Sequence, residues 1–570
     1  MNDNVITSDK LLISEKFNDF FINVGPNLAK SLKTVDRVPE YYLKTPLFNS
    51  IFLSPVTDEE LYQIFKELKN SAPGYDEIKT EPLRKALPHF ISPLNYICNI
   101  SLEQGVFPDE MKIANVIPLY KKEDSMVFSN YRPVSLLCSL SKVFEKIMYN
   151  RLVSFLEKYK ILYKYQFGFR KHHSTYQAII TLVDKIIKYL EDGDYILGVF
   201  LDFSKAFDTV DHAILLEKLH HYGIRDNALN WFASYLDNRK QYVTYNGVSS
   251  NMRVIKCGVP QGSILGPVLF LVYINDLATV CSNVFSIFFA DDSNIFKNGK
   301  NLLEIQEVIN KELKDISIWL NVNKLFMNIS KTQYMLFSGK KLENHSPNIV
   351  IEGIALSRVY STKFLGIIID DKLTWKDHIT YVSKKISKGL GVIRKARKCL
   401  NSETLLSLYY SFVYPYLTYC NQIWGNISSS ALQNLTVLQK RAVRIISGVP
   451  PRTHTLPLFK KWNNLNLYNL NCFIVGQFMF KFYKEKLPSI FDDFFTCNRD
   501  IHDHNTRRAN NLHYANFDTE LGKRSIGYWG VLVRNALLPL NLNLNVTIAT
   551  FKNNFKRVLL KEPFSFPVLD

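Results

Sequence analysis

The sequence lacks several features that would have pointed to a simple class of protein. Its eight cysteines are scattered along 570 residues without a C-x-x-C pair, which argues against a disulfide scaffold and against a zinc ribbon. The longest apolar run, residues 264–274, contains Gly266 and Pro267 and is too short to span a bilayer. The first residues show no basic region followed by an apolar core, so no signal peptide is predicted. We therefore expect an intracellular protein with no place in a membrane.

The chain also contains no internal repeat and no G-x-x-x-x-G-K-[ST] motif, which excludes a P-loop nucleotidase. Its length favours about two to four domains. Apolar residues make up 47% and aromatic residues 13%, which is enough for large cores. Positive charge is in excess: a net charge of +18 favours polyanionic partners, nucleic acid first.

Half of this net charge lies in residues 376–450, which contain 11 Lys and Arg but only 2 Asp and Glu. Apolar residues recur there at helical spacing: Ile379, Val382, Ile386, Leu390 and Ile393. Lysines fall on the opposite face of the predicted helix: Lys384, Lys388, Lys395 and Lys398. A single basic helix face is usually only solvated. The concentration of charge here instead favours contact with a phosphate backbone.

Two apolar, β-prone runs are each followed by aspartate. Residues 195–201 are typical of a strand buried on both faces, and Asp202 comes next. Residues 284–290 are followed by Asp291 and Asp292, in an Asp-Asp-Ser-Asn segment that predicts a turn between two short strands. Each motif alone is as easily explained by a solvated turn. If the two strands are adjacent, three carboxylates instead lie together at one edge of the sheet. A bound cation usually neutralises such a group of charges.

Carboxylate oxygens suit Mg²⁺ or Mn²⁺, and two such ions can stabilise the attacking and leaving oxygens of phosphoryl transfer. Between the two runs, Gly258, Gly262 and Gly266 would let the backbone approach a ligand closely, and the apolar residues after them predict a helix. On spacing alone this glycine-containing loop is a weak signal.

In their order along the chain, these segments resemble the reverse transcriptases of non-LTR retrotransposons (LINEs), most closely the jockey-like group. The resemblance includes VIPLYKKED and NYRPVSLLCSLSKVFEKIMYNRL (residues 116–152) and QFGFRKHHST (residues 166–175). LDFSKAFDTVDH, GVPQGSILGP and FADD are similar to the family's palm motifs A, B and C. NKLFMNISKTQYMLF and KFLGIIID are similar to motifs D and E. One departure is SAPGYDEI, where the family often has SAPGPDGI.

The resemblance implies roles for individual residues. Asp202, Asp291 and Asp292 match the catalytic aspartates that bind metal. Phe207 matches the aromatic gate that rejects a ribose 2′-OH. Lys331 matches the motif D lysine, a proton donor to pyrophosphate, although a surface lysine in a turn is the alternative reading. The other matches are implied to bind the incoming nucleotide: Lys121, Lys122, Arg132, Phe203, Gln261 and Gly262.

The implied fold is α+β: a right-hand polymerase with a ferredoxin-like palm and a mostly helical thumb and C-terminal region. We expect a linker and helical segment at residues 1–54 and an N-terminal extension and fingers at 55–189. The reverse transcriptase domain is expected at 101–370, with the palm mainly at 190–370. A basic helical thumb at 371–450 and a C-terminal helical domain at 451–570 complete the expected order.

The implied activity is that of an RNA-directed DNA polymerase, which extends a DNA primer on an RNA template with dNTPs and two Mg²⁺ ions, or Mn²⁺. The chain begins downstream of where the family's endonuclease would end, so a separate endonuclease domain or protein is an expected partner. A location in the nucleus or in a cytoplasmic ribonucleoprotein follows by analogy. Two alternatives stay open: an idle remnant that only binds nucleic acid, and an RNA-dependent RNA polymerase, which Phe207 disfavours.

Overall fold

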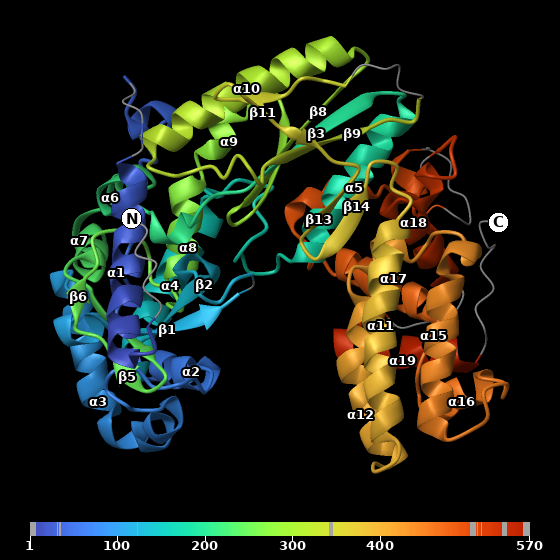
Figure 1. The fold of residues 1–570 in the computed structure, drawn as a ribbon, viewed down its shortest axis with the longest axis horizontal. Coiled ribbons are helices and arrows are strands. Elements are labelled where there is room, and N and C mark those ends of the chain that lie inside the picture. Colours follow the sequence, from blue (N-terminus) through green and yellow to red (C-terminus); the bar gives the residue numbers. More distant parts are fainter. Residues whose placement is uncertain are drawn as a thin grey trace.

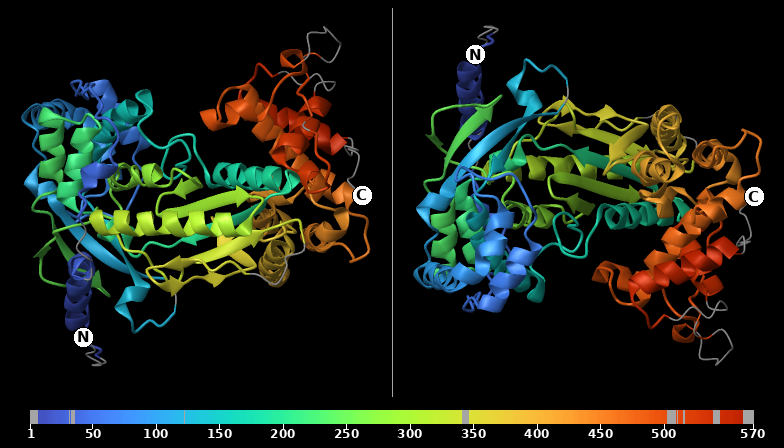
Figure 2. Two further views of the ribbon diagram at one scale, coloured as in Figure 1. Left: turned by 90° about the horizontal axis from the view of Figure 1, so that it is seen from above. Right: turned by 90° about the horizontal axis from the view of Figure 1, so that it is seen from below.

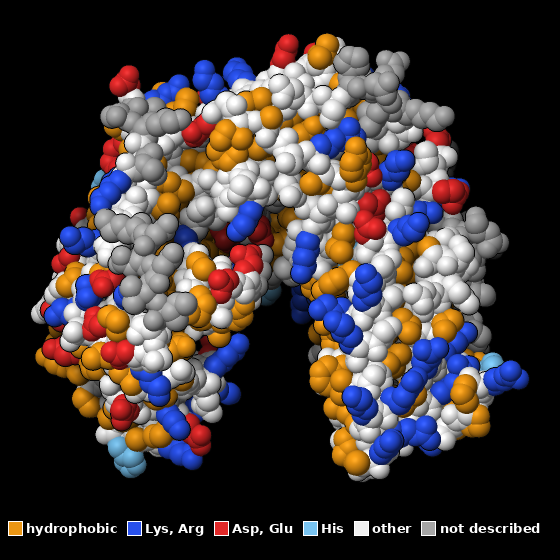
Figure 3. Space-filling view, viewed as in Figure 1, with side chains coloured by type: hydrophobic (Ala, Val, Ile, Leu, Met, Phe, Trp, Pro, Cys, Tyr) orange, Lys and Arg blue, Asp and Glu red, His pale blue; other side chains and the backbone are white. Residues whose placement is uncertain are grey.

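Two lobes flank an open hollow and are joined across the top by a β-sheet and its helices (Figure 1, Figure 3). The structure is a computed structural model, and it describes residues 7–30, 32, 36–121, 123–340, 346–501, 509, 511–514, 516–537 and 544–561. The first lobe comes from the N-terminal half of the chain and the second from residue 361 onward (Figure 1, Figure 2). The α+β class expected from the sequence is confirmed.

The first lobe is built around a small mixed sheet. Its strands are β1 (Ile113–Tyr120), β2 (Tyr131–Leu136), β4 (Lys240–Tyr245), β5 (Val248–Ser249) and β6 (Arg253–Val254). Its helices are α1 (Lys10–Ala29), α2 (Asp58–Glu67), α3 (Thr80–Gln104), α4 (Ser139–Lys158), α6 (His212–His221) and α7 (Asp226–Leu236). The helical segment expected within residues 1–54 is α1, and its buried Phe17 ring packs edge-on against Phe128 and Tyr131 beside the sheet.

The joining sheet has the strand order β12-β9-β3-β8-β7. Its strands are β3 (Tyr195–Leu201), β7 (Phe285–Phe289), β8 (Asp292–Gly299), β9 (Gln333–Phe337) and β12 (Ser357–Arg358). Three helices accompany it: α5 (Thr175–Glu191), α8 (Gly266–Ile274) and α10 (Leu302–Val322). Along the chain, β3-α8-β7-β8-α10-β9 forms a β-α-β-β-α-β unit in which neighbouring strands are antiparallel, the ferredoxin-like arrangement.

Strand β3 is covered on both faces, as its continuous apolar run predicts. Leu197, Val199 and Leu201 pack in the core that includes α8 and α10. Ile196, on the opposite face, packs in a second core with the apolar residues of α5. Because successive side chains of a strand point to opposite faces, both faces need apolar residues.

Apart from a short hairpin, β13 (Ser361–Phe364) with β14 (Ile367–Asp370), the second lobe is helical in the residues that the structure describes. Its longer helices are α11 (Lys376–Ala396), α12 (Ser402–Phe412), α15 (Ser429–Ser447), α17 (Leu467–Tyr483), α18 (Ile526–Leu537) and α19 (Ile548–Lys561). Short helices complete it: α13 (Tyr414–Thr418), α14 (Asn421–Trp424) and α16 (Leu456–Lys461). The apolar stripe predicted for α11 is buried, which confirms its helical spacing.

Helix α5 anchors the second lobe to the joining sheet. The carboxylate of Asp184 accepts hydrogen bonds from the backbone N–H groups of Ile526 (3.0 Å) and Gly527 (3.2 Å), at the start of α18. Glu191, at the end of α5, accepts from the backbone N–H groups of Asp518 and Thr519. The first N–H groups of a helix have no partner within it, so Asp184 satisfies a need that α18 cannot meet alone.

No helix in the described part of the chain is both long and apolar enough to cross a bilayer.

A buried ion pair joins three helices beneath the sheet. The Lys218 ammonium lies 2.6 Å from Asp276 and donates to the carbonyl of Tyr273, also at 2.6 Å. Asp276 accepts a further hydrogen bond, 2.9 Å long, from the indole of Trp319. Both charged side chains are 1% exposed or less. Each charge is therefore stable inside the protein only while the other is present.

Replacing Lys218 with Met leaves the Asp276 carboxylate buried without its cation, so we expect a loss of about 3–5 kcal/mol in the free energy of unfolding. Urea denaturation followed by tryptophan fluorescence measures this loss. Lys85→Met is the matched control because the Lys85–Glu81 pair is exposed, and we expect no measurable change there. Equal stability of the two variants would contradict this role for the buried pair.

Candidate active site

The three predicted aspartates lie at one end of the β3–β8 pair. Asp202 directly follows β3, and the antiparallel register pairs Leu201 with Ser293, one residue after Asp292. The strand adjacent to β3 is therefore β8, which begins at Asp292, and not β7, which precedes the pair of aspartates. An antiparallel neighbour brings its first residues to the end of β3, so Asp202 and Asp292 lie at the same end of the sheet.

The predicted position of the turn was wrong. Phe289 pairs with Asp292, which leaves only Ala290 and Asp291 in the loop between β7 and β8. Ser293, which was expected in the turn, instead continues β8 because it pairs with β3. Ala290 has φ 57°, a left-handed conformation that alanine rarely adopts outside a tight turn.

This turn is held from outside by the segment that precedes α5. The side-chain oxygen of Gln166, which is buried, accepts hydrogen bonds from the backbone N–H groups of Ala290 (3.0 Å) and Gly168 (2.8 Å). A Cβ on Gly168 would lie 2.3 Å from the Ala290 nitrogen, so only glycine fits there. Phe167 adds a backbone hydrogen bond of 2.9 Å to the carbonyl of Phe288. Residues 166–168 therefore fix the turn that carries Asp291.

The carboxylates of this site repel one another. Burial, together with the charges of Asp291 and Asp202, raises the pKa of Asp292 to about 6, although its side chain keeps an exposed surface. Burial also raises the pKa of Asp291, and Asp202 adds to the effect, while Arg132 and Lys121 oppose it. Three carboxylates held together in this way favour a bound cation.

The chain fits a divalent metal in donor type and charge, but the ligands are not preassembled. Asp202, Asp291 and Asp292 offer only oxygen atoms, which are the ligands that Mg²⁺ and Mn²⁺ prefer. Within the described residues, no three His, Cys, Asp or Glu side chains are close enough to form a ready-made metal site.

Segment 326–332 lies against the end of β3. The backbone N–H of Asp202 donates to the hydroxyl of Thr332 (3.3 Å), and its carbonyl accepts from the N–H of Asn328 (2.7 Å). Lys331 belongs to this segment, is exposed, and lies near enough to Lys205 to lower its pKa by charge repulsion. Phe203 is only 7% exposed and its backbone bridges to Met327, so its ring packs in the core.

Basic side chains lie near the carboxylates. One of this basic group, Lys205, was not among the site residues predicted from the sequence. Burial lowers the pKa of Lys205, Asp208 opposes this, and the charges of Lys121, Arg132 and Lys331 lower it further. The Lys205 ammonium donates weakly, at 3.4 Å, to the carbonyls of Ser129 and Tyr131. Its position in the sequence between Asp202 and Phe207 could have identified it as a candidate site residue. Lys122 lies outside the described residues.

Gln261 and Gly262 lie where strand β2 meets the site. The Gln261 carbonyl accepts from the N–H of Ser135 (2.8 Å), and its side chain donates to Asp208 (2.7 Å). Gly262 has φ 128°, and a Cβ there would lie 2.5 Å from the Ser135 carbonyl oxygen. Burial raises the pKa of Asp208 to about 6, while Gln261 and Lys205 oppose the rise. Asp208 therefore positions the Gln261 loop, a role the sequence did not reveal.

The ring of Phe207 stacks on Phe270 of α8, with centroids 4.3 Å apart and planes inclined by 25°. Phe207 keeps part of its surface exposed, whereas Phe270 is fully buried behind it. The ring is therefore fixed from behind while its outer side stays accessible.

The predicted backbone-binding lysines lie in the other lobe. Lys384, Lys388 and Lys395 are exposed on α11, and Lys398 follows that helix. Figure 3 shows Lys and Arg side chains gathered over α11 and α15, beside the hollow. The structure thus places these lysines on the second lobe, whereas the carboxylates lie at the end of the joining sheet.

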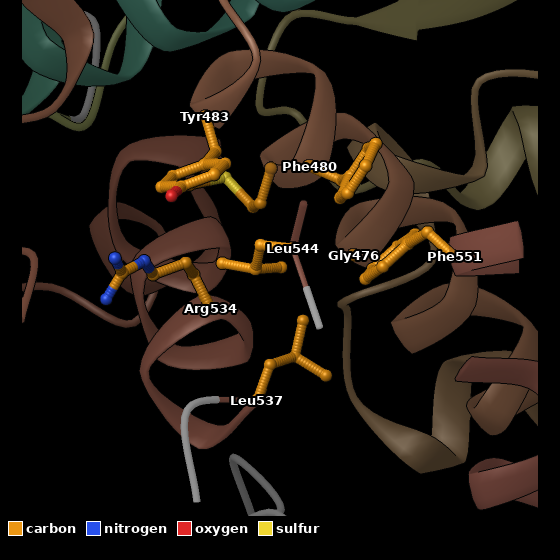
Figure 4. Close-up of a pocket in the computed structure, with 8 residues that line it drawn as sticks. Gly476, Phe480, Tyr483, Arg534, Leu537, Leu544 and Phe551 are labelled. Carbon is orange, nitrogen blue, oxygen red and sulfur yellow. The ribbon is translucent and has the colours of Figure 1, made fainter. Parts of the chain in front are cut away.

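A pocket in the second lobe holds none of the predicted site residues. It lies among α17, α18 and α19 and is lined mainly by apolar side chains, including Met479, Phe480 and Phe551, with Arg534 near Tyr483 (Figure 4). The candidate active site is therefore the end of the β3–β8 pair that carries the aspartates.

A ferredoxin-like sheet that carries paired aspartates between two lobes resembles the arrangement of the right-hand class of template-directed nucleic-acid polymerases. Residues 120–369 match the family described as reverse transcriptase (RNA-dependent DNA polymerase). Over this region the chain is similar to that family.

The similarity extends beyond the matched domain. The chain is 30% identical over 427 residues to the RNA-directed DNA polymerase from mobile element jockey of Drosophila melanogaster, covering 73% of this chain and 46% of that protein. It is 32% identical over 434 residues to the probable RNA-directed DNA polymerase from transposon BS of the same species, covering 72% and 46%. The resemblance to the jockey-like group is thus confirmed. The chain spans about half the length of these relatives.

The pKa of Asp292 is raised in the folded protein relative to the unfolded chain. Ionisation of its carboxyl therefore lowers the free energy of unfolding. The penalty is absent below about pH 4, develops as the pH rises toward 6, and is full above it. We expect Asp292→Asn to raise the Tm at pH 8 in metal-free buffer and to leave it unchanged at pH 3.5. Thermal unfolding of both proteins across this pH range measures the difference. A gain of the same size at every pH would contradict the electrostatic origin.

Proposed function

We propose that the chain is an RNA-directed DNA polymerase that extends the 3′-OH of a DNA primer on an RNA template, with dNTPs as substrates. One observation carries the proposal: three mutually repelling carboxylates lie at the end of the β3–β8 pair, and the positive charges of Arg132 and Lys121 act on them. Carboxylates and cations placed in this way match the needs of nucleotidyl transfer, where metal ions and a triphosphate must meet.

Asp202 and Asp291 would hold the divalent ions, two Mg²⁺ or Mn²⁺ in their place, with Asp292 beside them. Such ions, when bound, stabilise the attacking and leaving oxygens of phosphoryl transfer. Lys121, Arg132 and Lys205 would bind the triphosphate oxygens, since ammonium and guanidinium groups pair well with phosphate.

Two further side chains would act on the nucleotide and its product. Phe207 would lie under the sugar and exclude a ribose 2′-OH by contact. Lys331, exposed beside the site, would donate a proton to the departing pyrophosphate. Lys122 would join the phosphate contacts as the sequence resemblance implies.

The two lobes would share the template and primer. In this proposal residues 101–370 hold the site, and the basic thumb at 371–450 grips the duplex by its phosphate backbone. A separate endonuclease domain or protein would nick the target, and the complex would work in the nucleus or in a cytoplasmic ribonucleoprotein.

The direct test is primer extension on an RNA template with dNTPs and Mg²⁺, comparing the native chain with Asp291→Asn. We expect extension by the native chain and a loss of at least about 1,000-fold in the variant, because an amide cannot replace the carboxylate as a metal ligand. Extension with rNTPs but not dNTPs would indicate an RNA polymerase instead. Retained binding of an RNA–DNA duplex without extension by the native chain would contradict the proposed activity.

The role of the thumb is tested by the salt dependence of duplex binding. We expect log Kd to vary linearly with log[salt], and replacing Lys384, Lys388 and Lys395 with Gln to lower the slope by about one for each lysine that contacts phosphate. Lys85→Gln, on the far lobe, is the control and leaves the slope unchanged. An unchanged slope in the triple variant would place the duplex elsewhere.

A further inference from the structure

Phe169 occupies an unusual position beside the candidate site. It is 50% exposed and has φ 53°, a left-handed conformation that is rare for a bulky aromatic residue. Backbone strain of this kind persists only where the surrounding contacts impose it, and it is concentrated at functional sites.

Contacts on both sides of Phe169 impose this conformation. On the N-terminal side, the Gln166 side chain ties Gly168 to the Ala290–Asp291 turn. On the C-terminal side, Arg170 makes a two-pronged ion pair with Glu157, at 3.0 and 2.9 Å. The peptide of Phe169 is thus clamped between the turn that carries Asp291 and helix α4.

The clamped ring points toward the sugar gate. The centroid of Phe169 lies 6.1 Å from that of Phe207, with the rings perpendicular at 88°, the edge-to-face geometry that aromatic pairs favour. Phe207 is stacked on Phe270 as well. Its ring is therefore held by two aromatic neighbours, one buried in α8 and one exposed on the clamped loop.

We propose that Phe169 is a positioning residue for sugar selection: its ring keeps Phe207 pressed against Phe270, so that the gate cannot move aside for a 2′-OH. This inference rests on the proposed function and adds a specificity determinant to it. Since the same loop also holds the Asp291 turn, the gate and the carboxylates are placed by one segment.

The test uses Phe169→Gly, which removes the ring and also relieves the left-handed backbone, so the variant should fold with an unchanged or higher Tm. We expect dNTP extension to persist while the preference for dNTPs over rNTPs, as a ratio of kcat/KM values, falls by about two- to tenfold, the effect of losing one edge-to-face contact.

Three further variants sharpen the result. Phe207→Ala should lose more of the preference, and adding Phe169→Gly to it should change nothing further, because Phe169 acts through Phe207. Phe169→Tyr keeps the ring and should keep the native preference. Phe52→Gly, an exposed phenylalanine of the first lobe, is the matched control and leaves the preference unchanged.

Failure of the inference and failure of the proposed function give different results. An unchanged preference in an active Phe169→Gly variant overturns the inference, as does weaker primer binding with an unchanged preference, which would make Phe169 a primer contact. If the native chain does not extend primers, the preference is measured by binding instead. The concentrations of dNTP and of rNTP that stabilise its complex with primer and template in Ca²⁺ are then compared. Equal values for native and Phe169→Gly in that measurement also overturn the inference.

Discussion

The antiparallel pairing of β3 with β8 is the constraint on which the candidate site depends. It sets the end of one strand beside the start of the next, and so collects carboxylates that are about 90 residues apart in the sequence. A shift of one residue in this register would turn every side chain of β8 to the opposite face. The site is therefore specified by the same apolar contacts that bury both faces of β3, because those contacts fix the register.

The fold holds like charges close together in this region. Burial and then repulsion raise the pKa of Asp292, and burial and then crowding among cations lower the pKa of Lys205. In water these groups would separate or collect counterions, whereas here turns and strand ends keep them in place. Each group of like charges is thus favourable only with a ligand of opposite sign: divalent cations for the aspartates and a polyanion for the basic residues.

Sequence patterns predicted the elements better than the contacts between them. The apolar run of β3, the helix after the glycine-containing loop and the stripe of α11 were all predicted, because periodicity reports local burial. The position of the turn was wrong by two residues, since Asp-Asp-Ser-Asn favours a turn locally but pairing with β3 outweighs that preference. The roles of Gln166 and Asp208 were missed because they depend on partners 124 and 53 residues away in the sequence.

The cap that Asp184 gives to α18 has a consequence for how the chain is made. The acceptor is synthesised 342 residues before the N–H of Ile526 that it binds. At about 5–20 residues per second, roughly 20–70 s pass on the ribosome before the two can meet. During that interval the face of α5 that the second lobe covers is exposed to solvent and to other nascent chains. During synthesis the joining sheet and α5 are therefore complete before the helices that cover α5. A chaperone that binds apolar helix faces would bind the chain at this stage.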